Sequence, residues 1–513
     1  MLTKVYTAGL NGIEGFVITV ECSAWDRLPR FDMVGLGDTA VREAKERVRS
    51  AIENSGVMFP CLEIMVNLAP ANRKKEGSAL DLAIAVALLQ ADGTIPRSAP
   101  LEEACFIGEL SLSGEVKGVN GMLPLALAAK EAGKRWLFVP CENAKEAAVV
   151  EGVTVYGVKD LRALLGYFKQ QEELPCVSYD RCAFEAAASA HRFDMSEVKG
   201  QSGAKRAMEI AAAGGHNLLM IGPPGAGKSM LAKRLPTILP DFTFEEAVQT
   251  TKIYSVSGFL KENLMTARPF RAPHHTTSAV ALIGGGANPK PGEISLAHNG
   301  VLFLDELPEF PKTLTESLRQ PLEDGEVTVM RAAGRVRFPA SFMLVGAMNP
   351  CKCGNFGSGR TCTCRPGEVT KYLDRVSGPL LDRMDIQIEL PAVTYAQMHS
   401  EEENEESSAV IRARVNRARH FAKERFAALG VKDVFCNADL TGELIRKTCQ
   451  MSEEASVLLE NAFHSLSLSA RGHDKVLKVA RTIADLEESP LIERRHIAEA
   501  VAYRSLDRKY WKR

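Results

Sequence analysis

The sequence predicts an α/β protein whose core is a parallel sheet. Two observations lead to this fold class. The apolar run 218–221 is followed directly by a glycine-rich loop and then by a helical pattern, and the apolar run 301–304 ends in two carboxylates. Loops and acids at the carboxyl ends of short strands are typical of nucleotide-binding α/β sheets. In addition, the helical pattern from about residue 408 onward predicts a helical C-terminal region.

The glycine-rich loop has the spacing Gly-x-x-x-x-Gly-Lys-Ser of a phosphate-binding loop. Glycines allow the backbone to wrap closely around phosphates, so that its N–H groups point inward. A lysine at this spacing reaches the outer phosphates, and the serine offers an oxygen to Mg²⁺. We therefore predict that the chain binds and cleaves ATP with Mg²⁺, through Gly222, Pro223, Pro224, Gly225, Ala226, Gly227, Lys228 and Ser229.

The two carboxylates after the second apolar run predict the hydrolytic part of the site. Asp305 is expected to hold the Mg²⁺ environment, and Glu306 to polarise the attacking water. Without a phosphate loop upstream, a buried strand followed by a helix-capping acid would explain this pair equally well. A third apolar run, 342–348, ends at Asn349, whose side chain can orient the water beside the γ-phosphate.

Composition limits the remaining domains and partners. The 513 residues predict two to four domains, and a hydrophobic content of 45% suffices for packed cores. A net charge of −1 means that nucleic-acid binding would depend on local basic patches. We expect no membrane span, because no run of about 18 apolar residues occurs. Twelve cysteines without a secretory pattern predict mostly free thiols and a cytoplasmic location.

The N-terminal third predicts a separate α/β domain. Short apolar runs alternate there with glycine turns, and helical spacing predicts helices at 79–89 and 123–132. A polar, alanine-rich stretch that follows is expected to be a linker. The expected boundaries are 1–165 for the N-terminal domain, 166–190 for the linker, 191–392 for the nucleotide module and 393–513 for the helical lid.

Over nearly its whole length the chain resembles the AAA+ ATPases of the magnesium-chelatase-like group, and within them the ComM/YifB family. Such a resemblance implies a hexameric ring with ATP sites between subunits. It also implies a helicase that acts on branched or single-stranded DNA and drives branch migration in homologous recombination and natural transformation. Besides the phosphate loop and the two carboxylates, the resemblance rests on the segments 198–201, 268–275, 379–385 and 468–471.

The resemblance assigns roles to two arginines. Arg383 matches the family's arginine finger, which would reach the γ-phosphate of a neighbouring subunit. Its permanent charge and planar fork suit phosphate oxygens, and Arg375 is a second candidate. Arg471 matches the sensor arginine of the helical lid. The alternatives are a surface arginine paired with a nearby aspartate for Arg383, and an ordinary helix-start arginine for Arg471. No role is assigned to the family's His274 and His275.

Residues 326–338 predict a basic hairpin. Two β-prone runs flank a short turn, and three arginines lie near it. The hairpin resembles the inserted hairpin that lines the pore of ring helicases, where phosphate contacts would be independent of DNA sequence. A solvated hairpin with ordinary surface charges is an equally good interpretation. The candidate DNA contacts are Arg331, Arg335 and Arg337.

Four of the twelve cysteines lie close together in the glycine-rich stretch 350–365. Four thiolates can hold Zn²⁺ in a tetrahedral site and so stabilise a loop that has no core of its own. The Cys-x-Cys spacing is tighter than the usual Cys-x-x-Cys, and two disulfides or free thiols are the alternatives. The candidate ligands are Cys351, Cys353, Cys362 and Cys364.

The N-terminal domain resembles the proteolytic domain of Lon-type proteases over 75–82 and 114–123. Proteolysis in that domain needs a serine activated by a lysine. Ala79 takes the position of the nucleophile and Leu123 that of the lysine, while Ser78 is one residue away. We therefore expect a protease fold that serves as an assembly or DNA-contact domain and has no peptidase activity.

The sequence suggests three possible functions. The leading hypothesis is an ATP-dependent DNA motor. The alternative is a magnesium-chelatase-type ATPase that remodels a protein partner for metal insertion, although the chain has no integrin-like domain with an Asp-x-Ser-x-Ser pattern. The third, an ATP-dependent protease, is disfavoured by Ala79 and Leu123.

Overall fold

The computed structural model divides the chain into two compact units, which we describe separately. Unit 1 contains residues 1–185 and 244–266, and unit 2 contains residues 186–243 and 267–513. The backbone therefore passes from one unit to the other at 185–186, 243–244 and 266–267. The structure describes residues 2–35, 37–182, 184, 193–286, 288–331, 334–357, 359, 361–392, 405–431 and 434–511.

Unit 1 has two four-stranded sheets with a buried helix, α2 (Asp81–Ala91), against both of them. Positions 81–90 of α2 are all buried, as expected for a helix whose apolar residues lie on every side. This helix and α3 (Met122–Glu131) agree with the two helices expected from the sequence. The first sheet has the order β1 (Leu2–Asn11), β2 (Glu14–Trp25), β4 (Glu63–Ala69), β3 (Arg30–Val34), and the second β10 (Cys176–Val177), β9 (Thr154–Val158), β8 (Trp136–Pro140), β5 (Ala104–Phe106).

The helix α9 (Phe244–Ser257) belongs to unit 1, although its sequence lies within the span expected for the nucleotide module. Ser255 O accepts a hydrogen bond from Gly121 N, and Ser255 Oγ donates one to Glu146 Oε1 at 2.5 Å. Helical periodicity is the same in either setting, so only these long-range contacts decide where α9 packs. Likewise, β10 lies within the expected linker and pairs with β9.

Unit 2 is built around one five-stranded sheet in which every neighbouring pair of strands is parallel. All the loops that follow these strands therefore leave from one edge, which we call the carboxyl edge. This sheet, together with the C-terminal helices, has the architecture of an AAA+ core. Its order is β12 (Phe270–Arg271), β15 (Val301–Leu304), β18 (Met343–Met348), β11 (Leu218–Ile221), β19 (Ile386–Glu389).

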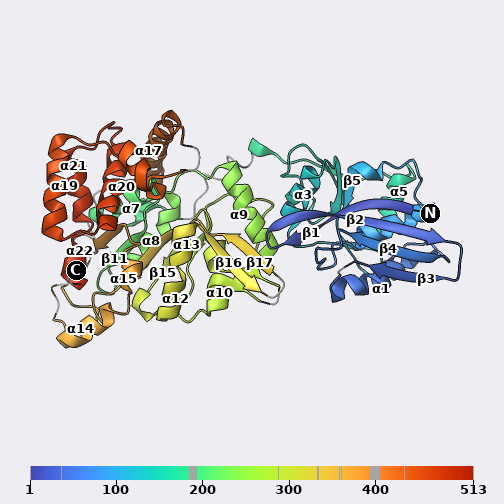
Figure 1. Ribbon diagram of the computed structural model, residues 1–513, viewed down its shortest axis with the longest axis horizontal. Coiled ribbons are helices and arrows are strands. Elements are labelled where there is room, and N and C mark those ends of the chain that lie inside the picture. Colours follow the sequence, from blue (N-terminus) through green and yellow to red (C-terminus); the bar gives the residue numbers. More distant parts are fainter. Residues whose placement is uncertain are drawn as a thin grey trace. The chain divides into compact units, whose positions relative to one another are not determined.

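The C-terminal helices share the hydrophobic core of the sheet. Helices α7 (Ser202–Gly214), α17 (Ser408–Ala428) and α20 (Ala470–Leu486) contact one another (Figure 1). Val415 and Val476 of these helices lie in the same buried cluster as Leu218 and Ile386 of the sheet. The expected lid is therefore part of the same compact unit; the first residues of its expected span, 393–404, lie outside the described residues.

A separate hairpin projects from unit 2, formed by β16 (Glu326–Arg331) and β17 (Gly334–Pro339). Within the described part of the chain, no helix is both long enough and apolar enough to cross a bilayer. The other elements are α1 (Thr39–Asn54), β6 (Glu109–Leu110), β7 (Val116–Lys117), α4 (Ala144–Ala147), α5 (Leu161–Phe168), α8 (Lys228–Arg234), α10 (Ala279–Ile283), β13 (Gly284–Gly285), β14 (Lys290–Pro291), α11 (Glu293–Leu296), α12 (Lys312–Ser317), α13 (Arg319–Asp324), α14 (Pro366–Leu373), α15 (Gly378–Leu381), α18 (Gly442–Thr448), α19 (Glu453–Leu466), α21 (Arg494–Ala502) and α22 (Leu506–Trp511).

Candidate nucleotide-binding site

The phosphate loop joins β11 to α8 at the carboxyl edge. Gly227 has φ = 89°, a conformation that side chains with a Cβ rarely adopt, and this lets α8 begin at Lys228. Lys228 Nζ donates hydrogen bonds to Gly222 O at 2.6 Å and to Asn349 Oδ1 at 3.0 Å. Burial lowers the pKa of Lys228, and the charge of Asp305 opposes this shift. The lysine thus joins the phosphate loop to the end of β18.

The two carboxylates follow β15 at the same edge. Ser229 Oγ donates a hydrogen bond to Asp305 Oδ2 at 2.5 Å, and the backbone N–H of Glu306 donates to Asp305 Oδ1 at 2.9 Å. A hydroxyl and a carboxylate side by side are hard oxygen ligands, which fit Mg²⁺. Glu306 has φ = 52°, and its side chain is 60% exposed. The carboxylate of Glu306 is therefore accessible to solvent.

His275 lies beside Glu306, a contact that the sequence analysis did not predict. His275 Nδ1 is 3.6 Å from Glu306 Oε2, and its ring packs against Phe310 with the centroids 6.3 Å apart. The ring of His274 lies 4.1 Å from that of His275. The sequence has no direct signal for this contact, because only the structure shows that β12, which the histidines follow closely, is the parallel neighbour of β15. Residues after neighbouring parallel strands meet at one edge of the sheet.

Arg383 and Arg471 lie at the opposite edge. Arg383 precedes β19, which starts at Ile386 and runs parallel to β11, so it is at the edge where the strands begin. Lys475 of α20 donates a hydrogen bond to Met384 O at 3.1 Å, which brings the start of α20 to the same edge. Arg471 is in the first turn of α20 and is exposed. The structure therefore separates these two arginines from the phosphate loop of their own chain.

Arg383 is held within its own chain by several contacts. Its guanidinium forms an ion pair with Glu323 and donates to Pro379 O at 2.9 Å, and only 11% of its side chain is exposed. Burial lowers the pKa of Arg383, and the charges of Arg319 and Arg471 lower it further.

Arg375 is in a different setting from Arg383. It is exposed and pairs at 2.8 Å with Glu309, which lies in the turn that follows Glu306. The two candidate finger residues are thus at opposite edges of the sheet, with Arg375 on the side of its own phosphate loop.

The β16–β17 hairpin has one apolar and one polar face. Val327 and Phe338 are paired and buried, whereas Arg335 and Arg337 are exposed on the other face. Glu326 Oε1 lies 3.9 Å and 3.7 Å from these two arginines and partly neutralises them. The side chain of Arg331 and the turn residues 332–333 lie outside the described residues.

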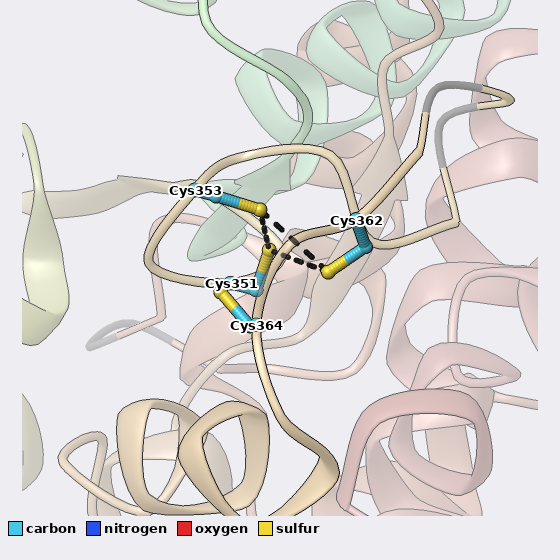
Figure 2. A group of neighbouring side chains, drawn as sticks. All are labelled: Cys351, Cys353, Cys362 and Cys364. Atoms are coloured by element: carbon cyan, nitrogen blue, oxygen red, sulfur yellow. Dashed lines mark hydrogen bonds between the residues drawn. The ribbon is translucent and has the colours of Figure 1, made fainter.

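The four clustered cysteines converge in the loop after Asn349 (Figure 2). We call residues 350–365 the four-cysteine loop. Its four sulfur atoms all lie within 4.8 Å of one another, and Cys351 is fully buried. The structure thus brings together the four thiols that the sequence grouped.

In unit 1, the residues nearest the expected protease site are engaged in structural contacts. Ser78 Oγ donates to the carboxylate of Glu109, and Lys75 Nζ donates to Pro70 O. Leu123 is fully buried. The absence of peptidase activity stays a prediction.

Comparison with known families matches most of the chain in three segments. Residues 194–398 match the family described as magnesium chelatase, subunit ChlI, residues 20–143 match subunit ChlI of Mg-chelatase, and residues 405–504 match the C-terminal part of that subunit.

Individual relatives align over almost their full length. The chain is 41% identical to competence protein ComM of Haemophilus influenzae, over 99% of this chain and 98% of that protein. It is 42% identical to the protein YifB of Escherichia coli with the same coverage, and 38% identical to Rv2897c of Mycobacterium tuberculosis over 98% of both chains. The chain therefore belongs to the ComM/YifB family of magnesium-chelatase-like AAA+ proteins.

Proposed function

We propose that this protein is an ATP-driven DNA motor, a hexameric helicase that promotes branch migration in homologous recombination and natural transformation. Membership of the family implies ATP hydrolysis with Mg²⁺. The observation that carries the motor proposal is the placement of the site at one edge of the sheet and of Arg383 and Arg471 at the other. The relative named as a competence protein supports a role with DNA, which we place in the cytoplasm.

The residues at the carboxyl edge can carry out hydrolysis. The phosphate loop and Lys228 would hold the β- and γ-phosphates, while Ser229 and Asp305 would hold Mg²⁺, which neutralises charge on the phosphates. Glu306 would polarise a water, whose oxygen attacks the γ-phosphorus as the bond to the β-γ bridging oxygen breaks. The water proton passes to the Glu306 carboxylate. Asn349 already bonds Lys228 and could orient that water.

The arginines at the opposite edge fit a ring. A four-residue strand spans roughly 13 Å, so Arg383 is far from its own γ-phosphate. In a cyclic assembly, the edge of the sheet where the strands begin in one subunit can face the carboxyl edge of the next subunit. Arg383 would then exchange its ion pair with Glu323 for phosphate oxygens, and Arg471 would accompany it. Arg375, which lies on the side of its own site, fits this role in trans less well.

DNA contact would involve the polar face of the hairpin. Arg335 and Arg337 are exposed on one face and anchored by the buried pair on the other. Their ion pairs with Glu326 are long and exposed, so they cost little to exchange for phosphate contacts. Such contacts would carry no base information.

A second candidate function is a magnesium-chelatase-type ATPase that remodels a protein partner for metal insertion. The matching families are described as subunits of magnesium chelatase, which favours this reading of the motor core. The 41% identity to a competence protein, over almost the full length of both chains, favours the DNA motor instead.

One experiment separates the two functions. The oligomeric state of the intact protein is measured with and without ATP, and its ATPase is then measured with a synthetic four-way junction. The DNA-motor proposal predicts that the junction stimulates the ATPase and that ATP drives strand exchange. An oligomer that neither binds nor moves junctions, but is stimulated by a porphyrin-pathway protein, would establish the chelatase-type function.

A further inference from the structure

The sulfur atoms of the four-cysteine loop are spaced for a single metal ion. Cys351 Sγ lies 3.3 Å from Cys353 Sγ and 3.8 Å from Cys362 Sγ, and the last two are 3.6 Å apart (Figure 2). Disulfide sulfurs would be bonded at about 2.0 Å, well below these distances. Zinc–sulfur bonds of about 2.3 Å in a tetrahedron place the sulfurs about 3.8 Å apart, close to these three distances. Cys364 Sγ lies within 4.8 Å of each of the other three sulfurs.

Backbone N–H groups surround these sulfurs. The N–H of Phe356 donates to Cys351 Sγ at 3.3 Å, and those of Asn355 and Thr363 hydrogen-bond Cys353. Thiolates that bind metals typically accept such outer hydrogen bonds, which orient the sulfur and offset its negative charge. The loop therefore supplies both four ligands and the donors that support them.

The four-cysteine loop has little other structure to hold its shape. Among its described residues, no strand forms, and the next helix begins at Pro366, directly after the loop. Gly354, Gly357 and Gly359 have φ values of 81°, 74° and 78°, so the backbone takes the left-handed conformation at three glycines. A metal ion is an efficient cross-link for such a segment, because it replaces the missing hydrophobic core.

The same loop supports the phosphate loop. A Cβ placed on Gly354 would come within 2.4 Å of Pro224 Cδ, so the backbone at Gly354 lies against the ring of Pro224. On the other side, Cys351 is two residues after Asn349, whose side chain accepts the hydrogen bond from Lys228. Displacing the four-cysteine loop would therefore disturb the phosphate loop from two directions.

We propose that the four-cysteine loop binds one Zn²⁺ ion and that this ion keeps the phosphate loop in its nucleotide-binding shape. The proposed metal site does not depend on the proposed function, whereas the effect of the metal on nucleotide affinity does. Because such coupling is reciprocal, a bound nucleotide should also slow the loss of zinc.

The test uses the full chain purified without chelators. Elemental analysis should find one zinc per chain in the parent and none in the double variant Cys353→Ser/Cys362→Ser. The matched control Cys61→Ser/Cys176→Ser removes two exposed thiols outside the loop and should keep its zinc. Iron in place of zinc, or zinc that both double variants retain, would overturn the site.

The coupling is tested separately with a fluorescent ATP analogue. Binding to the zinc-free variant should be weaker by roughly fivefold or more, and the nucleotide should slow zinc transfer to a chromogenic chelator. Gly354→Ala should keep zinc but weaken nucleotide binding, because its methyl group meets Pro224.

Gly359→Ala is the control for the backbone strain at Gly354, since the added Cβ has no described atom within 4 Å. It should leave nucleotide binding unchanged. Unchanged binding in both the zinc-free variant and Gly354→Ala would overturn the coupling. A parent protein that binds no nucleotide would instead refute the proposed function and leave the zinc result standing.

Discussion

The two units contain similar polar residues but arrange them in opposite ways. In unit 1, Asp81 is fully buried and forms a bidentate pair with Arg47 at 2.8 Å and 3.0 Å. In unit 2, Glu306 is 60% exposed beside the phosphate loop. Asp81 thus lies in the core of its unit, whereas Glu306 lies at the carboxyl edge of a parallel sheet, which faces outward. Charged residues within a fold therefore indicate a site only when the topology leaves them accessible.

We expect the largest effect on ATP turnover from a substitution of Glu306. Glu306→Gln should lower ATP turnover by up to about 10⁴-fold while nucleotide binding persists, because the general base is lost and the phosphate loop is intact. Lys228→Ala should instead weaken binding itself. Steady-state ATPase and a fluorescent-nucleotide titration measure the two effects. Parental turnover by Glu306→Gln would show that the exposed carboxylate is not the base.

Arg383 should give the next largest effect. Arg383→Ala should reduce ATPase by about 10³-fold, as expected for an arginine finger. Mixing Arg383→Ala subunits with Lys228→Ala subunits should restore part of the activity, because some interfaces then combine an intact loop with an intact finger. Arg375→Ala is the comparison variant and should not show this rescue. Absence of rescue in a verified mixed oligomer would remove Arg383 from the role.

The sequence was sufficient to predict the family and to place the glycine-rich loop and the two carboxylates after strands, because these depend on short motifs at the ends of apolar runs. Their roles in binding and cleaving ATP stay predictions. It did not predict that α9 packs in unit 1, or that Arg383 and Arg471 lie together away from Lys228. Both depend on strand order and long-range packing, which periodicity does not encode. The contact between His275 and Glu306 was also missed, since it requires knowing that β12 and β15 are neighbours.

At the carboxyl edge, we expect a substitution of His275 to have a smaller effect on turnover than one of Arg383 or Glu306. Its Nδ1 lies 3.6 Å from Glu306 Oε2, so we expect it to act on the reaction through that carboxylate. His275→Ala should lower turnover by roughly tenfold with little change in nucleotide affinity. In the Glu306→Gln background the same substitution should have almost no further effect, because the two residues act together. Additive losses in the double variant would refute this positioning role.

The two units should also respond differently to acid. Burial raises the pKa of Asp81 to about 6, so in unit 1 the folded state binds more protons than the unfolded state between about pH 4 and 6. In unit 2, burial lowers the pKa of His216 to about 4, so there the folded state binds fewer protons between about pH 6.5 and 4. Although burial of Asp385 acts to raise its pKa, the charges of Lys475 and His216 hold it below its ordinary value.

These signs predict that acid destabilises unit 2 before unit 1. Each such group changes the free energy of unfolding by up to about 1.4 kcal/mol per pH unit within its window. As the pH falls from 6.5 to 4, His216 lowers the stability of unit 2, whereas Asp81 raises that of unit 1; Asp385 adds to the loss in unit 2 only below about pH 4. Hydrogen exchange followed by mass spectrometry at pH 7 and pH 5 measures both units in one chain. His216→Gln should reduce the acid sensitivity of unit 2, and equal sensitivity of both units would contradict the assignment.

The smallest expected effect concerns α9, which packs in unit 1 although it lies between the two sequence segments of unit 2. Glu146 Oε1 accepts hydrogen bonds from Ser255 Oγ and from the N–H of Leu123, so this buried carboxylate joins α9 to α3. Ser255→Ala removes one donor and should cost about 1 kcal/mol of local stability. Hydrogen exchange should therefore speed up by roughly fivefold in α9 and at the start of α3. Ser257→Ala is the matched control, because Ser257 Oγ bonds Ile253 O within the same helix. If both variants exchange alike, α9 is held by its helical hydrogen bonds alone, and its place in unit 1 does not depend on the buried carboxylate.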